Sequence, residues 1–388
     1  MDSEVLHPAA DIVSVLSQLH GLRASDLHVT ADSVPRIRID GTLAYMPGTE
    51  LWSAAKVASL LDSLLTAEQA EIFARDLELD FSFTLAEGVR FRVNLYRQKG
   101  VVGAAFRVIP SQILTLEQLG LPASLGEFAS LPRGLVLVTG PTGSGKTSTL
   151  AALLEQVNQG RPGHIMTVED PIEYVHVGDK SLINQREVGS DTHSFADALR
   201  HVLRQDPDVI LIGELRDLET MSAALTAAET GHLVFATLHT QDAPQTIDRI
   251  IDIYPSDQQR QIRSQLATTL QGIVSQILLP HASGVGRVVA SEVLIVTPAI
   301  ANLIRESKTY QIPSAMMAGR EAGMHSMDQD LASLVSRGQI TLRAAYERAH
   351  DKQALMRFLG RDEAYVPSAD YDEFPDGLSA RFNAGRLR

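Results

Sequence analysis

The chain has 388 residues, 44% of them hydrophobic and 21% charged, which is enough for about two globular domains with substantial cores. The absence of cysteine excludes disulfides, cysteine-ligated zinc and a cysteine nucleophile. The formal net charge of −13 is opposite in sign to the basic surface typical of nucleic-acid-binding enzymes. Met1 to Leu6 is not a basic and apolar leader, and no apolar run reaches transmembrane length. We therefore expect a cytoplasmic protein that meets a membrane only through partners.

Residues 1–110 have the pattern of a small α+β domain. Helical spacing of apolar residues predicts helices over 11–22, 54–65 and 67–75. Alternating Ile37 and Ile39 predict a strand within 34–41 that enters a tight turn at Asp40-Gly41, and further strands are predicted over 80–84, 89–95 and 101–108. The domain is expected to end near Pro110.

Arginines recur on two of these predicted strands. Arg90, Arg92 and Arg97 lie on or just after one strand and Arg107 on another. The simplest interpretation is the outward polar face of an antiparallel sheet. Residues 111–133 contain several prolines and glycines and are predicted to be a linker with one short helix.

A glycine-rich turn follows the apolar run 135–138 and precedes an Ala/Leu-rich helix predicted over 148–157. Glycines there let the backbone fold around an anion, and the helix N-terminus adds a partial positive charge. A lysine in this position reaches the β- and γ-phosphates of a nucleotide, and the following hydroxyl ligates Mg²⁺. The run is therefore predicted to bind a nucleotide, and it consists of Gly140, Pro141, Thr142, Gly143, Ser144, Gly145, Lys146 and Thr147.

Further strands of an open α/β sheet follow, over 165–168, 209–212 and 233–240. Ligands bind at the carboxyl ends of such strands, so the acids after the first two are candidates for the site. Glu169 and Glu173 follow the first strand, and Glu214 follows the second in the position of a Walker B acid that holds Mg²⁺. His232 and His239 bracket the third strand, where a γ-phosphate sensor and a packing role are both open.

The rest of the domain, over 134–360, is predicted to be mainly helical. Ser194 is expected to cap a helix over 194–204. Apolar spacing predicts one long amphipathic helix over 258–279 and a strand over 288–296. Residues 361–388 are acidic and contain proline and glycine, which predicts a flexible tail. The other predicted helices cover 219–228, 247–253, 299–306 and 327–337.

Taken together, these motifs resemble the secretion-type hexameric ATPases, and within them most closely the type IV pilus retraction ATPases. The resemblance covers about 11–359. Its most specific parts are the acidic box 168–173 and the histidine box 231–240 at these separations from Lys146. It implies an α/β fold, with a RecA-like P-loop ATPase domain preceded by a smaller PAS-like domain.

The resemblance also implies roles for individual residues. Glu173 would be the base or orienter of the attacking water, with Glu169 in reserve because spacing does not separate the two. Glu214 would be the Walker B acid, and His232 and His239 polar partners of the site. Arg92 and Arg107 would be arginine fingers that reach a nucleotide from the N-terminal domain.

The function implied is an Mg²⁺-dependent ATPase, working as a homohexamer with an inner-membrane platform protein at the pilus base. Such a motor would retract the pilus and drive twitching motility. The family motif Ala-Ile-Arg-Asn-Leu-Ile-Arg-Glu is kept at 299–306 except for Ala301 in place of the first arginine. The alternatives are a pilus-assembly or type II secretion ATPase, a RecA-like nucleic-acid translocase, and a scaffold that binds ATP only as a switch. The lack of a four-cysteine zinc element disfavours the first, and the acidic composition the second.

Overall fold

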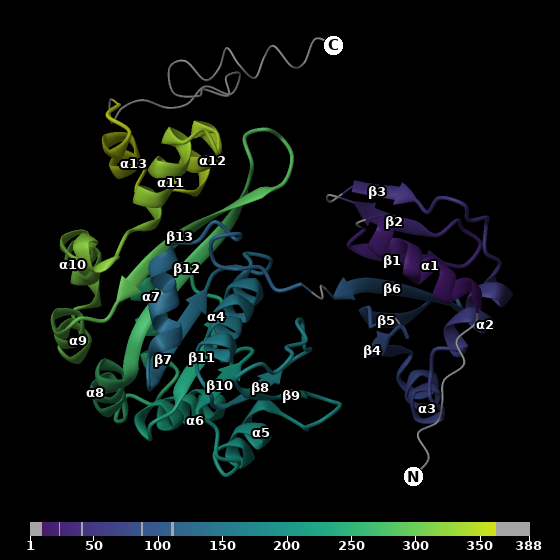
Figure 1. Ribbon diagram of the computed structural model, residues 1–388, viewed down its shortest axis with the longest axis horizontal. Helices are drawn as coiled ribbons and strands as arrows, with labels where there is room; N and C mark the ends of the chain where they lie inside the picture. Colours follow the sequence, from purple (N-terminus) through teal and green to yellow (C-terminus); the bar gives the residue numbers. More distant parts are fainter. Residues whose placement is uncertain (1–9, 23, 40–41, 87, 110–111, 362–388) are drawn as a thin grey trace. The chain divides into compact units, whose positions relative to one another are not determined.

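The computed structural model describes residues 10–22, 24–39, 42–86, 88–109 and 112–361 (Figure 1). The chain divides into two compact units, Met1–Gln112 and Ile113–Arg388. The predicted turn at Asp40-Gly41 and nearly all of the predicted tail lie outside the described residues.

The N-terminal unit is an antiparallel sheet with helices, as its pattern predicts. The strand order is β3-β2-β1-β6-β5-β4, and every pair in it is antiparallel. The helices are α1 (Ala10–Gly21), α2 (Ala54–Asp62) and α3 (Ala67–Asp76). The strands are β1 (Asp26–Thr30), β2 (Arg36–Ile39), β3 (Thr42–Tyr45), β4 (Glu78–Thr84), β5 (Arg90–Gln98) and β6 (Val101–Ile109).

One face of this sheet is apolar and packs against the helices. Leu27, Phe91 and Phe106 point to that face and are fully buried, together with α1 and α2 residues such as Leu16 and Val57. Side chains alternate along a strand, so the residues between them point to the opposite face. Asp26, Arg92 and Arg107 lie on this second, polar face, as expected for an antiparallel sheet with one covered side.

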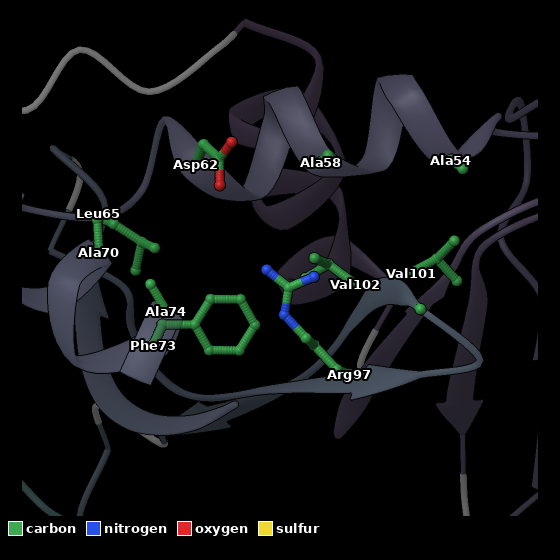
Figure 2. Close-up of a pocket in the computed structure, with 11 residues that line it drawn as sticks. Ala54, Ala58, Asp62, Leu65, Ala70, Phe73, Ala74, Arg97, Val101 and Val102 are labelled. Atoms are coloured by element: carbon green, nitrogen blue, oxygen red, sulfur yellow. The ribbon is translucent and has the colours of Figure 1, made fainter. Parts of the chain in front are cut away.

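A cavity of about 340 Å³ lies among α2, α3 and the β5–β6 turn (Figure 2). Alanines of both helices line it, which leaves room between the elements. In the close-up, the Arg97 side chain points toward the ring of Phe73, and the guanidinium carbon is 5.5 Å from the ring centroid. Asp62 lies at the α2 side of the same cavity.

The second unit is built on a mixed sheet of order β13-β12-β7-β11-β10-β8-β9. All neighbours in it are parallel except β13, which is antiparallel to β12. The strands are β7 (Gly134–Thr139), β8 (His164–Glu169), β9 (Leu182–Glu187), β10 (Val209–Ile212), β11 (Leu233–Leu238), β12 (Leu270–Pro280) and β13 (Arg287–Ile295). The carboxyl ends of β7, β8, β10 and β11 therefore meet at one edge.

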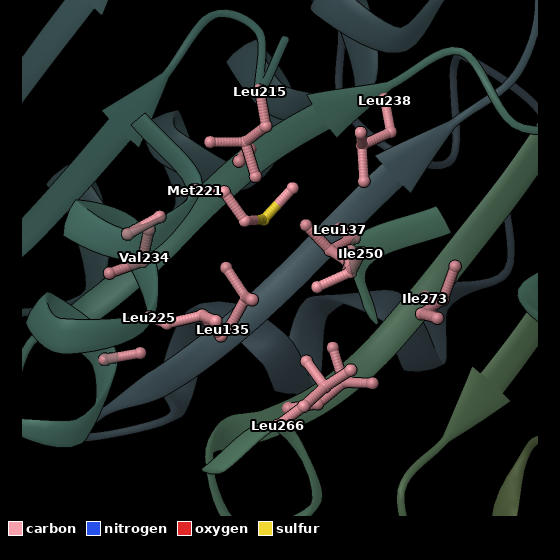
Figure 3. Packing of buried hydrophobic residues seen from close by; sticks show 14 of the residues in the cluster. Leu135, Leu137, Leu215, Met221, Leu225, Val234, Leu238, Ile250, Leu266 and Ile273 are labelled. Carbon is pink, nitrogen blue, oxygen red and sulfur yellow. The ribbon is translucent and has the colours of Figure 1, made fainter. Parts of the chain in front are cut away.

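Both faces of this sheet are covered, so its central strands are apolar on both sides. Val136 and Phe235 pack on the face that carries α4 (Lys146–Gly160). Leu135, Val234 and Ile273 pack on the other face, among residues of α6 (Leu218–Glu229), α7 and α8 (Figure 3). The other helices on that side are α5 (Phe195–Val202), α7 (Ala243–Asp252), α8 (Gln259–Thr269), α9 (Pro298–Arg305) and α10 (Ile312–Ala318). The predicted α/β fold is confirmed.

The prediction of one long helix over 258–279 is wrong. α8 ends at Thr269, and the chain continues as β12 between β7 and β13. A strand buried on both faces is almost continuously apolar, so its periodicity does not separate it from a buried helix. The strand requires a glycine at position 272, because a Cβ there would collide with the ring of Phe128.

Residues 113–133, predicted as a linker, are packed as part of the second unit. A short 3₁₀ helix, Ala123–Ser130, lies against α4, and Leu116, Leu125 and Phe128 are buried in the core on that side. Further along, β12 and β13 form a long hairpin that runs beside α11 (Figure 1). A small separate core joins this hairpin to α11 (Met327–Ser336), α12 (Leu342–Arg348) and α13 (Lys352–Phe358).

Candidate active site

The turn between β7 and α4 has the backbone of a phosphate-binding loop. The backbone φ angle is positive at three glycines of the turn, +138° at Gly140, +78° at Gly143 and +91° at Gly145. Residues with a Cβ rarely adopt such values. A Cβ at Gly140 would collide with the backbone oxygen of Gln276. The Lys146 ammonium donates hydrogen bonds to the carbonyl oxygens of Gly140 (2.9 Å) and Pro141 (3.1 Å). The lysine thus lies folded across its own loop, where a phosphate would sit.

Side chains of β12 support this loop from below, and neither the strand nor these contacts were predicted from the sequence. The Gln276 amide donates to the carbonyl of Ser144 (2.8 Å) and accepts from the Thr149 hydroxyl (2.9 Å). One residue earlier, Ser275 accepts a hydrogen bond from Thr139 at the end of β7 (2.8 Å). Gln276 is only 2% exposed, so these bonds are shielded from water. The loop is therefore shaped by a strand that lies more than 120 residues further along the chain.

Glu214 lies just past the carboxyl end of β10, as predicted for a Walker B acid. Its carboxylate oxygens contact Arg216 (2.7 Å) and Nε2 of His239 (3.2 Å). Burial of the Glu214 carboxyl works against ionisation, yet the hydrogen bonds and charges of Arg216 and His239 hold its pKa below the usual value. Glu214 is thus an ionised acid at neutral pH, the form that a magnesium site requires.

Lys146 and two acids interact electrostatically at this sheet edge. Burial lowers the pKa of Lys146, while the charges of Glu214 and Glu173 act in the opposite direction. Glu173 is exposed on the loop after β8. The structure therefore brings together Lys146, Glu173, Glu214 and His239, the residues on which the nucleotide-site prediction rests.

Glu169, the reserve candidate for the base, has a different environment. It is 6% exposed at the end of β8 and accepts hydrogen bonds from the Thr167 hydroxyl (2.7 Å) and the Gln185 amide (3.1 Å). Burial raises the pKa of the Glu169 carboxyl above its usual value. Its Oε1 atom is thus occupied by two donors of the protein, whereas Glu173 lies open to solvent.

His232 is not brought to this edge. It precedes β11, and its carbonyl accepts from Gly134 at the start of β7. Its ring nitrogen Nδ1 lies 2.9 Å from the carbonyl of Ala227. The strand between His232 and His239 places them roughly 20 Å apart, at about 3.3 Å per residue. The prediction that both histidines lie at one site is therefore not met within a single chain, because His232 is at the opposite end of β11 from His239.

The two predicted arginine fingers lie side by side in the N-terminal unit. Arg92 and Arg107 are direct partners across β5 and β6 and so share the polar face of the sheet. Arg107 donates to Asp26 (2.8 Å), and Arg92 lies 3.7 Å from Asp80. The Arg107 side chain is nevertheless 69% exposed, so its remaining donors are accessible to an anion.

Two general observations complete the description of the site. Within the described ranges, no three histidine or acidic side chains form a group that could hold a metal ion. No helix in the part of the chain that the structure describes is long and apolar enough to span a bilayer.

Comparisons with known proteins agree with these features. The type IV pilus retraction ATPase PilT of Pseudomonas aeruginosa is 48% identical over 339 residues, which cover 87% of this chain and 98% of PilT. The twitching motility protein of Neisseria gonorrhoeae is 48% identical over 340 residues, which cover 86% of this chain and 91% of that protein. A crystal structure of the pilus retraction motor PilT with bound ADP matches with a TM-score of 0.84 and 47% identity, over 89% of this chain and 99% of that chain.

A profile of the type II/IV secretion system protein family matches residues 7–364. The resemblance stated from the motifs is therefore confirmed, and the chain belongs to the type II/IV secretion system protein family.

Proposed function

We propose that this chain is an ATP-hydrolysing motor that retracts type IV pili and so powers twitching motility. The observation that carries the proposal is the meeting of Lys146, Glu173 and Glu214 at one sheet edge. It occurs in a chain that aligns with 98% of the PilT sequence at 48% identity.

The residues present suit a bound ATP with Mg²⁺. The buried hydroxyl of Ser144 has no hydrogen-bond partner in the loop, so it is free to serve a phosphate oxygen. Thr147 at the start of α4 and the ionised Glu214 would hold the ion, directly or through water. When bound, Mg²⁺ neutralises phosphate charge as the terminal phosphoryl group is transferred.

In the proposed reaction this chain mainly positions groups and neutralises charge. Backbone amides of the loop bind the phosphates, and Lys146 exchanges its bonds to Gly140 and Pro141 for phosphate oxygens. Glu173 orients a water in line with the γ-phosphorus and takes its proton. His239 holds Glu214 in place through their contact.

Arg92 and Arg107 would act as arginine fingers on a nucleotide. An arginine finger accelerates phosphoryl transfer about 10³- to 10⁵-fold in other NTPases. The two guanidinium groups share one sheet face, so they can approach one anion together. A closed ring of identical head-to-tail contacts is compatible with the cyclic homohexamer that we propose for this chain. We propose that this hexamer acts at the cytoplasmic face of the inner membrane, on a platform protein at the pilus base.

Glu173→Gln tests the catalytic assignment. This variant should bind ATP normally but release no phosphate, because the amide cannot accept the proton of the water. Wild-type turnover in the variant would refute the role of Glu173.

Deletion of the gene in its host tests the direction of the motor. Hyperpiliated cells that cannot twitch are expected for a retraction motor, whereas cells without pili would indicate an assembly ATPase. The test matters because Ala301 replaces an arginine of the retraction-linked motif. In the structure Ala301 is buried against the core on α9, where a guanidinium would have to be accommodated.

A further inference from the structure

The loop that carries Glu173 is held through its backbone. It connects β8 to β9 and spans residues 170–181. Glu173 itself is exposed, and the N–H of the preceding Ile172 donates to the Glu187 carboxylate at the end of β9 (3.1 Å). The direction in which the Glu173 carboxylate points therefore depends on how firmly the backbone around it is fixed.

Gln185 on β9 fixes the residues that follow Glu173. Its amide nitrogen donates to the carbonyl of Tyr174 (2.8 Å), and its amide oxygen accepts from the N–H of His176 (2.8 Å). The same nitrogen also donates to the Glu169 carboxylate (3.1 Å). One side chain thus joins the backbone just after Glu173 to the buried acid at the end of β8.

Glu169 completes this arrangement from the end of β8. Its Oε1 atom accepts from the Thr167 hydroxyl on its own strand and from the Gln185 amide on the neighbouring strand β9. It is 6% exposed, so water offers little competition for these bonds. The acid is therefore placed to hold the loop rather than to meet a substrate.

The residue after Glu173 also contacts the helix that follows the phosphate-binding loop. The hydroxyl of Tyr174 lies 2.8 Å from the hydroxyl of Ser148, the residue after Thr147 on α4. Tyr174, the residue after Glu173, is thus held by α4 through its side chain and by Gln185 through its carbonyl. An orienter of water needs this precision, because a misplacement of about 1 Å can cost about 100-fold in rate.

We propose that Gln185 and Glu169 are positioning residues, which hold the loop so that Glu173 points at the attacking water. Neither touches the reacting atoms. This inference rests on the proposed function, since it assumes that Glu173 orients the water.

The first test replaces Gln185 by leucine in the full-length protein. Gln185→Leu keeps the approximate volume but removes all three hydrogen bonds. We expect kcat for phosphate release to fall about 10- to 100-fold. The Kd for ADP should change less than about twofold, because the phosphate-binding loop is not touched.

Asn158→Leu is the matched control. Asn158 is another buried amide that holds the same loop, but it bonds to Val177 (2.9 Å) and Asp179 (2.9 Å), beyond Glu173. A similar loss of thermal stability with kcat within about twofold of wild type is expected. An equal fall in kcat for both variants, or full kcat in Gln185→Leu, would overturn the positioning role.

A second pair of variants, at Glu169, tests the proposal if Gln185→Leu does not fold. Glu169→Gln retains a carbonyl oxygen that accepts from Thr167 and Gln185, whereas Glu169→Ala does not. We expect kcat to be at least about tenfold higher in Glu169→Gln than in Glu169→Ala. Equal kcat values in the two variants would overturn the role of Glu169.

The assays also separate this inference from the function on which it rests. An inactive Glu173→Gln with a fully active Gln185→Leu would leave the proposed function intact and refute the positioning pair. A fully active Glu173→Gln would refute both, because the positioned group would then have no role in turnover.

Discussion

Replacement of Gln276 by leucine should weaken nucleotide binding, although Gln276 lies on a strand with no nucleotide motif. The substitution leaves the Ser144 carbonyl without its partner in a buried site, which costs about 1–3 kcal/mol. Thr149 can fall back on the carbonyl of Gly145, at 3.3 Å, so its loss is nearer about 0.5–1.5 kcal/mol. We expect a total loss of about 1.5–4.5 kcal/mol in the free energy of unfolding.

Without this bond the free loop is expected to relax so that the Ser144 carbonyl reaches water, and nucleotide binding must then restore the loop at a similar cost. A cost of about 1–3 kcal/mol corresponds to a Kd for ADP raised about 5- to 150-fold. Isothermal titration calorimetry with ADP measures the affinity, and urea unfolding measures the stability.

The matched control is Gln271→Leu. Gln271 is on the same strand, but its amide contacts the carbonyl of Thr269 at 3.5 Å, far from the loop. Its Kd for ADP should equal that of wild type. If folded Gln276→Leu also bound ADP with wild-type affinity, the argument that β12 shapes the loop would be refuted.

Three further changes test other residues of the second unit, among them Glu292 on β13. Gly140→Ala should bind no nucleotide in a titration with ADP, because its methyl group would collide with Gln276 in a backbone of φ +138°; measurable binding would contradict this. His239→Ala removes an interaction that lowers the pKa of Glu214, so the acid limb of the kcat/KM profile should move to higher pH; an unmoved limb would count against the contact. Burial raises the pKa of Glu292, so this carboxyl binds a proton more readily in the folded protein than in the unfolded chain. As the pH rises above about 4.5, the ionisation of Glu292 therefore lowers the free energy of unfolding. The free energy of unfolding of Glu292→Gln minus that of wild type should therefore be more positive at pH 8 than at pH 5, as measured by urea unfolding. An equal difference at both pH values would disprove this.

The parts of the site that were predicted from sequence are those that local pattern determines. A buried strand, a glycine turn and a helix follow one another at 134–160, and each is set by residues within a few positions. Glu214 was predicted because parallel strands bring their carboxyl ends to one edge. The cap at Ser194 is also local, and its side chain accepts from the N–H of Asp197 as expected.

The parts that were not predicted depend on distant contacts or on weak periodicity. β12 is apolar on both faces, so it resembled a continuation of α8, and the role of Gln276 was missed with it. Gln185 lies on β9, an edge strand with a mixed polar pattern that gives no strong strand signal. His232 was grouped with His239 because both bracket one predicted strand and belong to the family's histidine box, but an extended strand separates its two ends more than any other local structure.

The parallel pairing of β12 with β7 has a consequence for biosynthesis. Thr139 and Ser275, which bond across these strands, are 136 residues apart. At about 5–20 residues per second, a ribosome needs roughly 7–27 s to make the intervening chain. The loop between β7 and α4 therefore gains its contacts with β12 late in translation, when the other parallel strands have already emerged. A nascent subunit should consequently begin to bind nucleotide only after most of its sheet has been synthesised.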